Sequence, residues 1–287
     1  MPAPNAIAVE KLSRLIGRPD SPAIVDVCTD EDFAANPRLI PGAVRRRWSE
    51  VPVWASEYSD VNRPIVVACQ KGLKLSQGVA AWLRHAGLVA DVLEGGVQAW
   101  AAAGQPMVAA EKLPPRDPKG QTVWVTRQRP KVDRIACPWL IRRFVDPHAV
   151  FLFVAPSEVR AVAERFQATP FDIEGEDVFW GHRGERCTFD TMIEEFGLGG
   201  EVLNRLADIV RGADTGRLET TPESAGLLAA SLGLSRMYAD DLEQLEAGFA
   251  LYDAFYRWCR DARDETHDWP PARSGRASRK VRPAPAI

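Results

Sequence analysis

The sequence predicts an α/β protein, with a parallel sheet flanked by helices in the first half and a mainly helical α+β second half. In the first half, short β-branched or apolar runs alternate with helical patterns, as in proteins with parallel sheets. In the second half, two strand-like runs are followed by helical periodicity. A proline-rich, charged stretch separates the halves. The predicted strands are Ala23–Val27, Ile65–Ala68, Val89–Leu93, Thr122–Thr126 and Val150–Val154.

Length and composition favour two globular domains. The chain has 287 residues, and a domain usually takes roughly 100–200. Hydrophobic residues make up 46% and charged residues 26%, which excludes a mainly disordered or fibrous chain. The formal net charge of −3 is too small for whole-surface affinity for nucleic acid.

The predicted boundaries follow local composition. We expect a first domain at residues 5–110, a linker at 111–120, a second domain at 121–262 and a disordered basic tail at 263–287. The linker lies in AEKLPPRDPKGQ, which holds three prolines among charges. Beyond Trp269 there are five basic residues, no acidic ones and four prolines. We interpret this segment as a solubilising tail; as a nucleic-acid partner it would make only weak, non-specific contacts, so no specific nucleic acid is expected.

The cysteines do not form a disulfide framework, because their number is odd and their spacing is wide. They are Cys28, Cys69, Cys137, Cys187 and Cys259. The N-terminal segment lacks a basic region followed by an apolar stretch, and no apolar run approaches the ~18 residues that span a bilayer. We therefore expect a soluble, cytoplasmic protein with reduced thiols and no membrane partner.

The most informative segment surrounds Cys69. A predicted strand ends there, the loop CQKGLKL follows, and Ser76 is expected to be the N-cap of a helix that ends at Gly87. Its expected apolar face contains Val79, Trp82, Leu83 and Ala86. This order places a thiol at the carboxyl edge of a parallel sheet and beside a helix N-terminus, which favours the thiolate.

The loop residues suggest an anion-binding cradle around this thiol. Lys71 and Lys74 supply positive charge, and Gly72 allows a tight turn with the amides pointing inward. The alternative is a small buried cysteine beside solvated lysines.

Four motifs in this half carry a family resemblance. In order, IVDV, IPGAV, IVVACQKGLK and LEGGVQAW resemble a single rhodanese (sulfurtransferase) domain over residues 5–110. The resemblance implies that Cys69 carries a persulfide and that the following residues surround it. These are Gln70, Lys71, Gly72, Leu73, Lys74, Leu75 and Ser76. The phosphatase relatives have one loop residue more and end in arginine, so Leu75 disfavours a phosphatase.

The segment also departs from the family pattern. Cys28 stands where the family usually has arginine, Arg38-Leu39 replaces Gly-His, and Lys74 stands where arginine is commoner. Cys28 is either a resolving thiol or strand packing.

The resemblance implies a sulfurtransferase that moves sulfur from a thiosulfate-like donor to a thiol or cyanide acceptor and requires no cofactor for this step. The alternative is a non-catalytic protein that senses or binds chromate or another tetrahedral oxyanion in the same cradle.

The second half resembles the C-terminal domain of the chromate-resistance ChrB family over residues 121–262. The blocks that carry the resemblance are VWVTRQRPKVDRIACPWLIRRFVD, FDIEG, GHRGERCTFDTMI, LADIVRGADT and YDAFYRWC. That family often joins this domain to a winged-helix DNA-binding region, which a rhodanese domain replaces here. The fusion suggests that sulfur mobilised at Cys69 serves defence against chromate, through Cys137 or Cys187.

Several residues of this half are candidates for a site of unknown metal content. Lys131 and Arg134 precede Cys137, which either lies at a helix N-cap set by Pro138 or faces the core of a helix that begins at Asp133. With Cys137, the pair His182 and Cys187 suits a soft metal, but no CxxC or HxxxH spacing is present, and turn and capping roles are the alternative.

Two further patterns are structural. Asp208 and Asp214 flank Arg211, which predicts helix capping and an ion pair. A long helix is expected from Asp240 to Arg260 with one apolar stripe. The stripe comprises Leu242, Leu245, Phe249, Tyr252, Tyr256 and Cys259.

Overall fold

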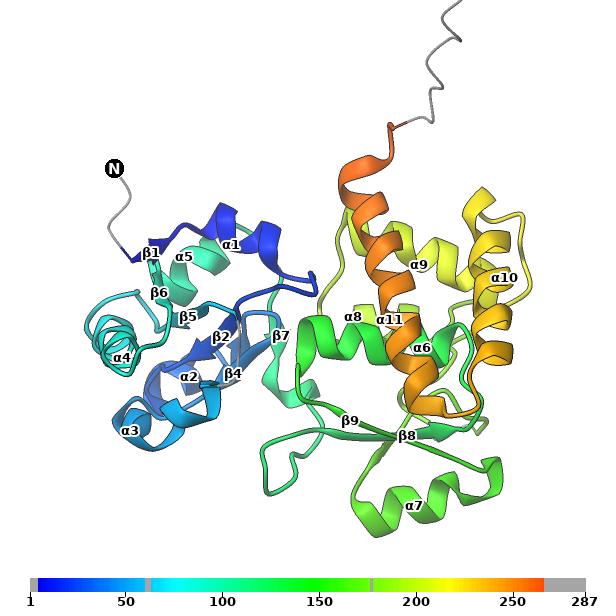
Figure 1. Cartoon of the computed structure of the whole chain (residues 1–287), viewed down its shortest axis with the longest axis horizontal. Coiled ribbons are helices and arrows are strands. Elements are labelled where there is room, and N and C mark those ends of the chain that lie inside the picture. The colour runs from blue at the N-terminus through cyan, green and yellow to red at the C-terminus, as the bar shows by residue number, and fades with distance from the viewer. Residues whose placement is uncertain (1–4, 60–62, 176–177, 266–287) are drawn as a thin grey trace, which may run out of the picture.

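The computed structural model describes residues 5–59, 63–175 and 178–265, so most of the predicted basic tail lies outside the described residues. The first half contains a five-stranded, all-parallel sheet (Figure 1). In spatial order the strands are β1 (Ala6–Ile7), β6 (Ala90–Leu93), β5 (Ile65–Ala68), β2 (Ala23–Asp26) and β4 (Ala43–Arg45). The three strands predicted here are confirmed to within one residue at their ends.

Every residue of β5 is buried, because helices cover both faces of this sheet. Val67 and Cys69 face a cluster with helices α3 and α4, whereas Val66 and Ala68 face the opposite cluster, with α1 and α5. The helices are α1 (Val9–Leu15), α2 (Asp30–Ala35), α3 (Val51–Trp54), α4 (Lys74–His85) and α5 (Gly96–Ala102).

The second half is mainly helical α+β, as predicted, and the structure shows that its small sheet is parallel. Its strands run in the order β10 (Thr169–Pro170), β8 (Val123–Arg127) and β9 (Val150–Val154). Helix α7 (Val159–Phe166) lies on one face of this sheet and the remaining helices lie on the other (Figure 1). These are α6 (Asp133–Leu140), α8 (Thr188–Glu195), α9 (Glu201–Asp214), α10 (Pro222–Met237) and α11 (Asp241–Arg257).

Shorter elements complete the chain. Strands β3 (Arg38–Leu39) and β7 (Val108–Ala109) pair in antiparallel orientation. The 3₁₀-helical segments are Trp48–Glu50, Ala55–Tyr58, Ala110–Lys112 and Pro156–Glu158, and the π-helical segments are Ile141–Val145 and Trp258–Ala262. Within the described ranges, no helix is long and apolar enough to span a membrane.

The two halves share one hydrophobic core. A single cluster of buried side chains extends from Leu12 and Trp100 in the first half to Trp139 and Phe144 in the second. The backbone N–H of Gly42 donates to the carbonyl of Phe144 at 2.7 Å. The halves are therefore joined by packing as well as by the chain.

The expected linker lies against the second half. Lys112 pairs with Glu195 at 2.8 Å, and Arg116 pairs with the buried Asp146 at 3.2 Å. The proposed boundary at residues 111–120 remains a prediction.

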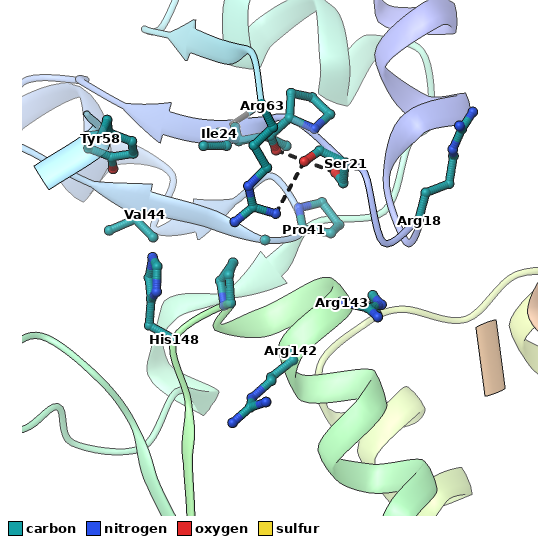
Figure 2. A pocket seen from close by; sticks show the side chains of 14 residues that line it. Arg18, Ser21, Ile24, Pro41, Val44, Tyr58, Arg63, Arg142, Arg143 and His148 are labelled. Carbon is teal, nitrogen blue, oxygen red and sulfur yellow. Dashed lines mark hydrogen bonds between the residues drawn. The ribbon is translucent and has the colours of Figure 1, made fainter. Parts of the chain in front are cut away.

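A small cavity lies between the halves (Figure 2), lined by Arg18, Arg63, Arg142, Arg143 and His148 among others. Its volume of about 30 Å³ has room for one or two water molecules and not for a substrate. Arg142 pairs with Glu246 at 2.5 Å and Arg143 with Asp253 at 2.8 Å, both outside the cavity lining. The charges of these two arginines are thus compensated by carboxylates outside the cavity.

Two helix predictions need correction. Helix α4 begins at Lys74, so Ser76 lies inside its first turn and is not the N-cap. Trp82 is 46% exposed, and the buried face consists of Ser76, Val79, Ala80 and Leu83. Gly87 follows the helix end with φ of +84°, the left-handed conformation that suits a terminating glycine.

The long C-terminal helix is confirmed as α11, which continues into a π-helical turn at Trp258–Ala262. The Asp240 carboxylate caps its N-terminus by accepting hydrogen bonds from the N–H groups of Leu242 and Glu243, each at 2.9 Å. Leu242 is 52% exposed and does not belong to the buried stripe, whose other members are buried.

Candidate functional site

Cys69 lies directly after β5, at the carboxyl edge of the parallel sheet, as the sequence predicts. Its carbonyl accepts a hydrogen bond from the N–H of Val97 at 3.0 Å, and the carbonyl of Gln70 accepts one from Gln98 at 3.0 Å. The start of the loop is thus held against the first turn of α5.

Two glycines allow this close approach. Gly72 has φ of +68°, as expected for the tight turn, and a Cβ there would lie 2.5 Å from the carbonyl oxygen of Leu93. Gly96 has φ of +62°, and a Cβ there would overlap the carbonyl of Cys69 and the N–H of Gly72. Sequence reasoning quoted Gly96 within the LEGGVQAW motif without recognising its role against the loop.

The loop leaves an array of backbone donors unused. In the described structure, none of the N–H groups of residues 70–76 donates a hydrogen bond to a protein acceptor. The last three belong to the first turn of α4, where N–H groups have no partner within the helix. Unpaired donors at a helix start favour an anion.

The thiol has one close polar neighbour. Cys69 is 5% exposed, and its Sγ lies 3.2 Å from Oγ of Ser76, which also contacts the carbonyl of Leu73 at 3.2 Å. Ser76, expected to be a helix cap, therefore contacts the thiol instead. Lys71 and Lys74 are exposed, and neither forms an ion pair with any described residue.

Cys28 lies on the other face of the sheet, in the cluster opposite to that of Cys69. Burial and the neighbouring Asp26 carboxylate raise the pKa of its thiol far above the ordinary range. Its N–H donates to the Asp26 carboxylate at 2.8 Å, and Arg45 donates to its carbonyl at 3.1 Å. This environment favours packing over a resolving role, because a protonated thiol is a poor nucleophile.

In the second half, the structure decides between the two positions considered for Cys137. Helix α6 begins at Asp133 with Pro138 inside it, and Cys137 is fully buried, so the N-cap alternative is wrong. Burial raises its pKa well above the ordinary value. Cys187 is also fully buried and is the N-cap of α8, where Asp190 accepts its N–H at 3.0 Å.

His182 lies among carboxylates, and it does not form a ligand set with Cys137 and Cys187 as considered from the sequence. Its Nε2 is 3.2 Å from Oδ2 of Asp214, 3.5 Å from Oδ1 of Asp172 and 3.7 Å from Oδ2 of Asp133. Arg134 approaches the far side of Asp172 at 3.4 Å. The structure thus brings His182 and Arg134 to one cluster; Lys131 forms no ion pair with the described residues.

The carboxylates set the protonation of this cluster. Hydrogen bonds to Asp172 and Asp214 raise the pKa of His182 to about 10. Burial and the neighbouring carboxylates of Asp214 and Asp172 raise the pKa of Asp133 well above its usual range. Despite its burial, Asp172 has a lowered pKa because His182 and Thr188 donate hydrogen bonds to it.

Sequence reasoning missed the three aspartates of this cluster. Asp133 and Asp172 lie in quoted motifs, but no local spacing relates them to His182, and Asp214 was assigned to capping beside Arg211. The prediction for Asp208 is confirmed, since Arg211 pairs with it, whereas Asp214 contacts His182. The structure itself marks the position, because Val132, a β-branched residue directly before Asp133, has a strained φ of +37°.

The fold and the Cys69 loop define an α/β domain with a thiol beside unpaired amides at the carboxyl edge of its sheet. Residues 8–103 match the rhodanese-like domain family, and residues 124–259 match the family described as ChrB, C-terminal domain. The chain therefore belongs to the rhodanese-like family in its first half and carries a ChrB C-terminal domain in its second. Both resemblances inferred from the sequence are confirmed.

Individual relatives agree with this division. Protein ChrB of Cupriavidus metallidurans is 37% identical over 158 residues, which cover 53% of this chain and 46% of that protein. A sulfurtransferase of Allochromatium vinosum is 32% identical over 108 residues, which cover 37% of this chain and 97% of that protein. The chain thus spans about half the length of ChrB and nearly all of the sulfurtransferase.

Among solved structures, thiosulfate sulfurtransferase from Pseudomonas aeruginosa is 28% identical, with a TM-score of 0.34. The match covers 39% of this chain and 21% of that one.

Proposed function

We propose that this chain is a sulfurtransferase in which Cys69 carries sulfane sulfur as a persulfide. The Cys69 thiolate attacks the outer sulfur of thiosulfate or a similar donor; the S–S bond of the donor breaks, and sulfite leaves with the bonding electron pair. A thiol or cyanide then attacks the outer sulfur of the persulfide, which restores the Cys69 thiolate.

The observation that carries the proposal is the nearly buried thiol of Cys69 directly before residues 70–76, whose N–H groups donate to no protein acceptor in the described structure. Preorganised N–H groups stabilise negative charge on an entering donor and a departing sulfite. The Ser76 hydroxyl lies 3.2 Å from both Sγ and the carbonyl of Leu73, so rotation of its one proton from the carbonyl to Sγ would give the thiolate a donor. The unpaired charges of Lys71 and Lys74 attract anionic donors to the loop.

The ChrB C-terminal domain supports a link between this chemistry and chromate resistance. Cys137 and Cys187 do not suit the role of sulfur acceptor, because both are fully buried with raised pKa values. We therefore place the acceptor outside the chain, as a separate thiol compound. The buried thiols of Cys137 and Cys187 then take no part in sulfur transfer at Cys69.

The same N–H groups also favour a second function, non-catalytic binding of chromate. Chromate and thiosulfate are both tetrahedral dianions, so one set of donors suits either. In this case binding does not require the thiol, and it survives Cys69→Ser.

The test combines transfer kinetics with mass spectrometry. Thiosulfate treatment of the full chain should add about 32 Da, one sulfur atom, at Cys69. Transfer to cyanide should disappear in Cys69→Ser and persist in Cys259→Ser, a matched removal of a buried thiol in the π-helical turn after α11. Absence of an adduct with every sulfur donor, together with chromate binding that survives Cys69→Ser, would reject the enzyme in favour of the binding protein.

A further inference from the structure

We propose that Asp133, His182 and Asp214 bind a divalent transition-metal ion in the second half of the chain. The three residues come from the start of α6, the loop before α8 and the end of α9. One potential ligand atom from each lies within 4.8 Å of the other two. The proposed site is separate from the Cys69 loop and does not depend on sulfur transfer.

The distances suit a small ion. Nε2 of His182 lies 3.2 Å from the nearest Asp214 oxygen and 3.7 Å from Oδ2 of Asp133. Ligands that surround an ion at about 2.0–2.2 Å are themselves about 3.0–3.5 Å apart in octahedral or tetrahedral geometry. The two distances from the imidazole are thus close to those of a metal site, and the ligand oxygens of Asp133 and Asp214 lie within 4.8 Å of each other.

An unpaired buried oxygen gives the second, independent indication. The Asp133 side chain is fully buried, and its Oδ2 accepts hydrogen bonds from the N–H groups of Thr188 at 2.6 Å and Phe189 at 3.3 Å. Its Oδ1 has no hydrogen-bond partner in the described structure. A buried carboxylate oxygen without a partner is costly, and a cation beside this carboxylate would compensate it.

The backbone is held so that this carboxylate faces the cluster. Val132, in its strained conformation, immediately precedes Asp133, and its carbonyl accepts a hydrogen bond from the Tyr252 hydroxyl at 2.9 Å. Both residues are buried. Strain that the surrounding structure maintains in this way is typical of functional sites.

Asp172 supports the cluster from outside the proposed ligand set. Its Oδ1 accepts the Thr188 hydroxyl at 2.9 Å, and its Oδ2 faces Arg127 at 3.3 Å and Arg134 at 3.4 Å. A bound metal ion would displace the protons of His182 and Asp133, and the carboxylates of Asp133, Asp172 and Asp214 would then outnumber these two guanidinium groups by one. The cluster thus retains negative charge for a cation, while the arginines orient Asp172.

The donor set indicates which ions fit. One imidazole and two carboxylates suit Zn²⁺ or Mn²⁺, and Zn²⁺ should bind more tightly according to the usual order of divalent ions. The His182 side chain is 44% exposed and that of Asp214 is 18% exposed, which gives an ion a route from solvent and leaves room for water ligands.

The experiment uses the full chain after removal of metal with a chelator and dialysis. Titration calorimetry with Zn²⁺ alone, and in parallel with Mn²⁺ alone, should show about one site per chain, with thermal stabilisation on binding. His182→Ala and Asp214→Asn should each weaken Zn²⁺ affinity by more than tenfold. Asp208→Asn is the matched control, because Asp208 lies on the same helix, is half-buried and pairs with Arg211 instead.

Unchanged Zn²⁺ affinity in both His182→Ala and Asp214→Asn would place the ion elsewhere and reject the site. Absence of binding to the wild-type chain would also reject it and would leave His182 as an imidazolium that bridges carboxylates. Circular dichroism of each variant confirms that it is folded, and the exposure of His182 makes His182→Ala the safer of the two.

Discussion

The contact between Gly96 and the Cys69 loop predicts a large effect for a single added methyl group. In Gly96→Ala, the new Cβ would overlap the carbonyl of Cys69 and the N–H of Gly72, and both are backbone atoms that no rotamer change can move. The residue would also adopt φ of +62°, which costs an L-residue roughly 1–2 kcal/mol. Overpacking adds about 1–3 kcal/mol, so we expect a total loss of about 3 kcal/mol.

Gly87→Ala provides the matched control. Gly87 has φ of +84°, but nothing lies within 4 Å of a Cβ built there. Only the conformational cost remains, about 1 kcal/mol. The difference between the two variants therefore isolates the steric overlap at the loop.

The assay is thermal unfolding followed by circular dichroism, together with sulfur transfer from thiosulfate. At roughly 2 °C per kcal/mol for a chain of this size, Gly96→Ala should lower the Tm by about 6 °C and Gly87→Ala by about 2 °C. Transfer should fall in Gly96→Ala alone, because its loop N–H groups are displaced. Equal Tm values for the two variants would refute the inferred packing of the loop against the start of α5.

Three further predictions concern stability. Lys112 and Arg183 lower the pKa of Glu195 from its ordinary 4.5, so these ion pairs stabilise the fold above that pH and cease to do so as the pH falls below it. Glu195→Gln should therefore flatten the acid dependence of the urea midpoint between pH 5 and about pH 3. An unchanged dependence would contradict the pairing. Asp240→Ala removes the cap of α11 and should cost about 1 kcal/mol in chemical denaturation, whereas an unaltered midpoint would show that the cap is dispensable. Phe144→Ala removes a buried ring from the shared core and should cost about 3–5 kcal/mol, with faster proteolysis in both halves; protection that persists in the first half would contradict a common core.

The parts of the fold that sequence reasoning predicts are those whose signal is local. Strand β5 is buried at every position, so its continuous apolar run could belong only to a covered parallel strand or a buried helix, and its four-residue length favours the strand. Cys69 and its loop are consecutive in the chain, and the position of the thiol at the sheet edge follows from strand order alone. The fold of the first half and the position of the Cys69 site could therefore both be predicted from the sequence.

The remaining features depend on tertiary contacts or on a shift of a few residues. Ser76 fits the pattern of an N-cap, but α4 begins at Lys74 without any side-chain cap, and the hydroxyl contacts the thiol instead. The apolar period of the same helix includes Trp82, which lies at the edge of the buried face and remains exposed. Periodicity finds the helix but does not set the limits of its buried face.

The cluster around His182 is the clearest example of information that no local spacing contains. Asp133 begins α6, Asp172 lies in the loop after β10 and Asp214 ends α9, so only tertiary packing brings them to the imidazole. A spacing rule for cysteine and histidine ligands directs attention to Cys137 and Cys187, which are buried neighbours of the cluster instead of its donors.

The hydrophobic cluster that extends from one half to the other should hold the two halves together even after a protease cuts the chain between them. A cut in the exposed turn around Lys119 would break the chain but would leave Phe144 in place against Gly17 and the carbonyl of Phe144 bonded to Gly42. We expect the nicked fragments to migrate together on gel filtration and to separate only in denaturant. A fragment produced alone would expose the apolar surface that its counterpart covers, so the halves are best regarded as partners in one assembled particle.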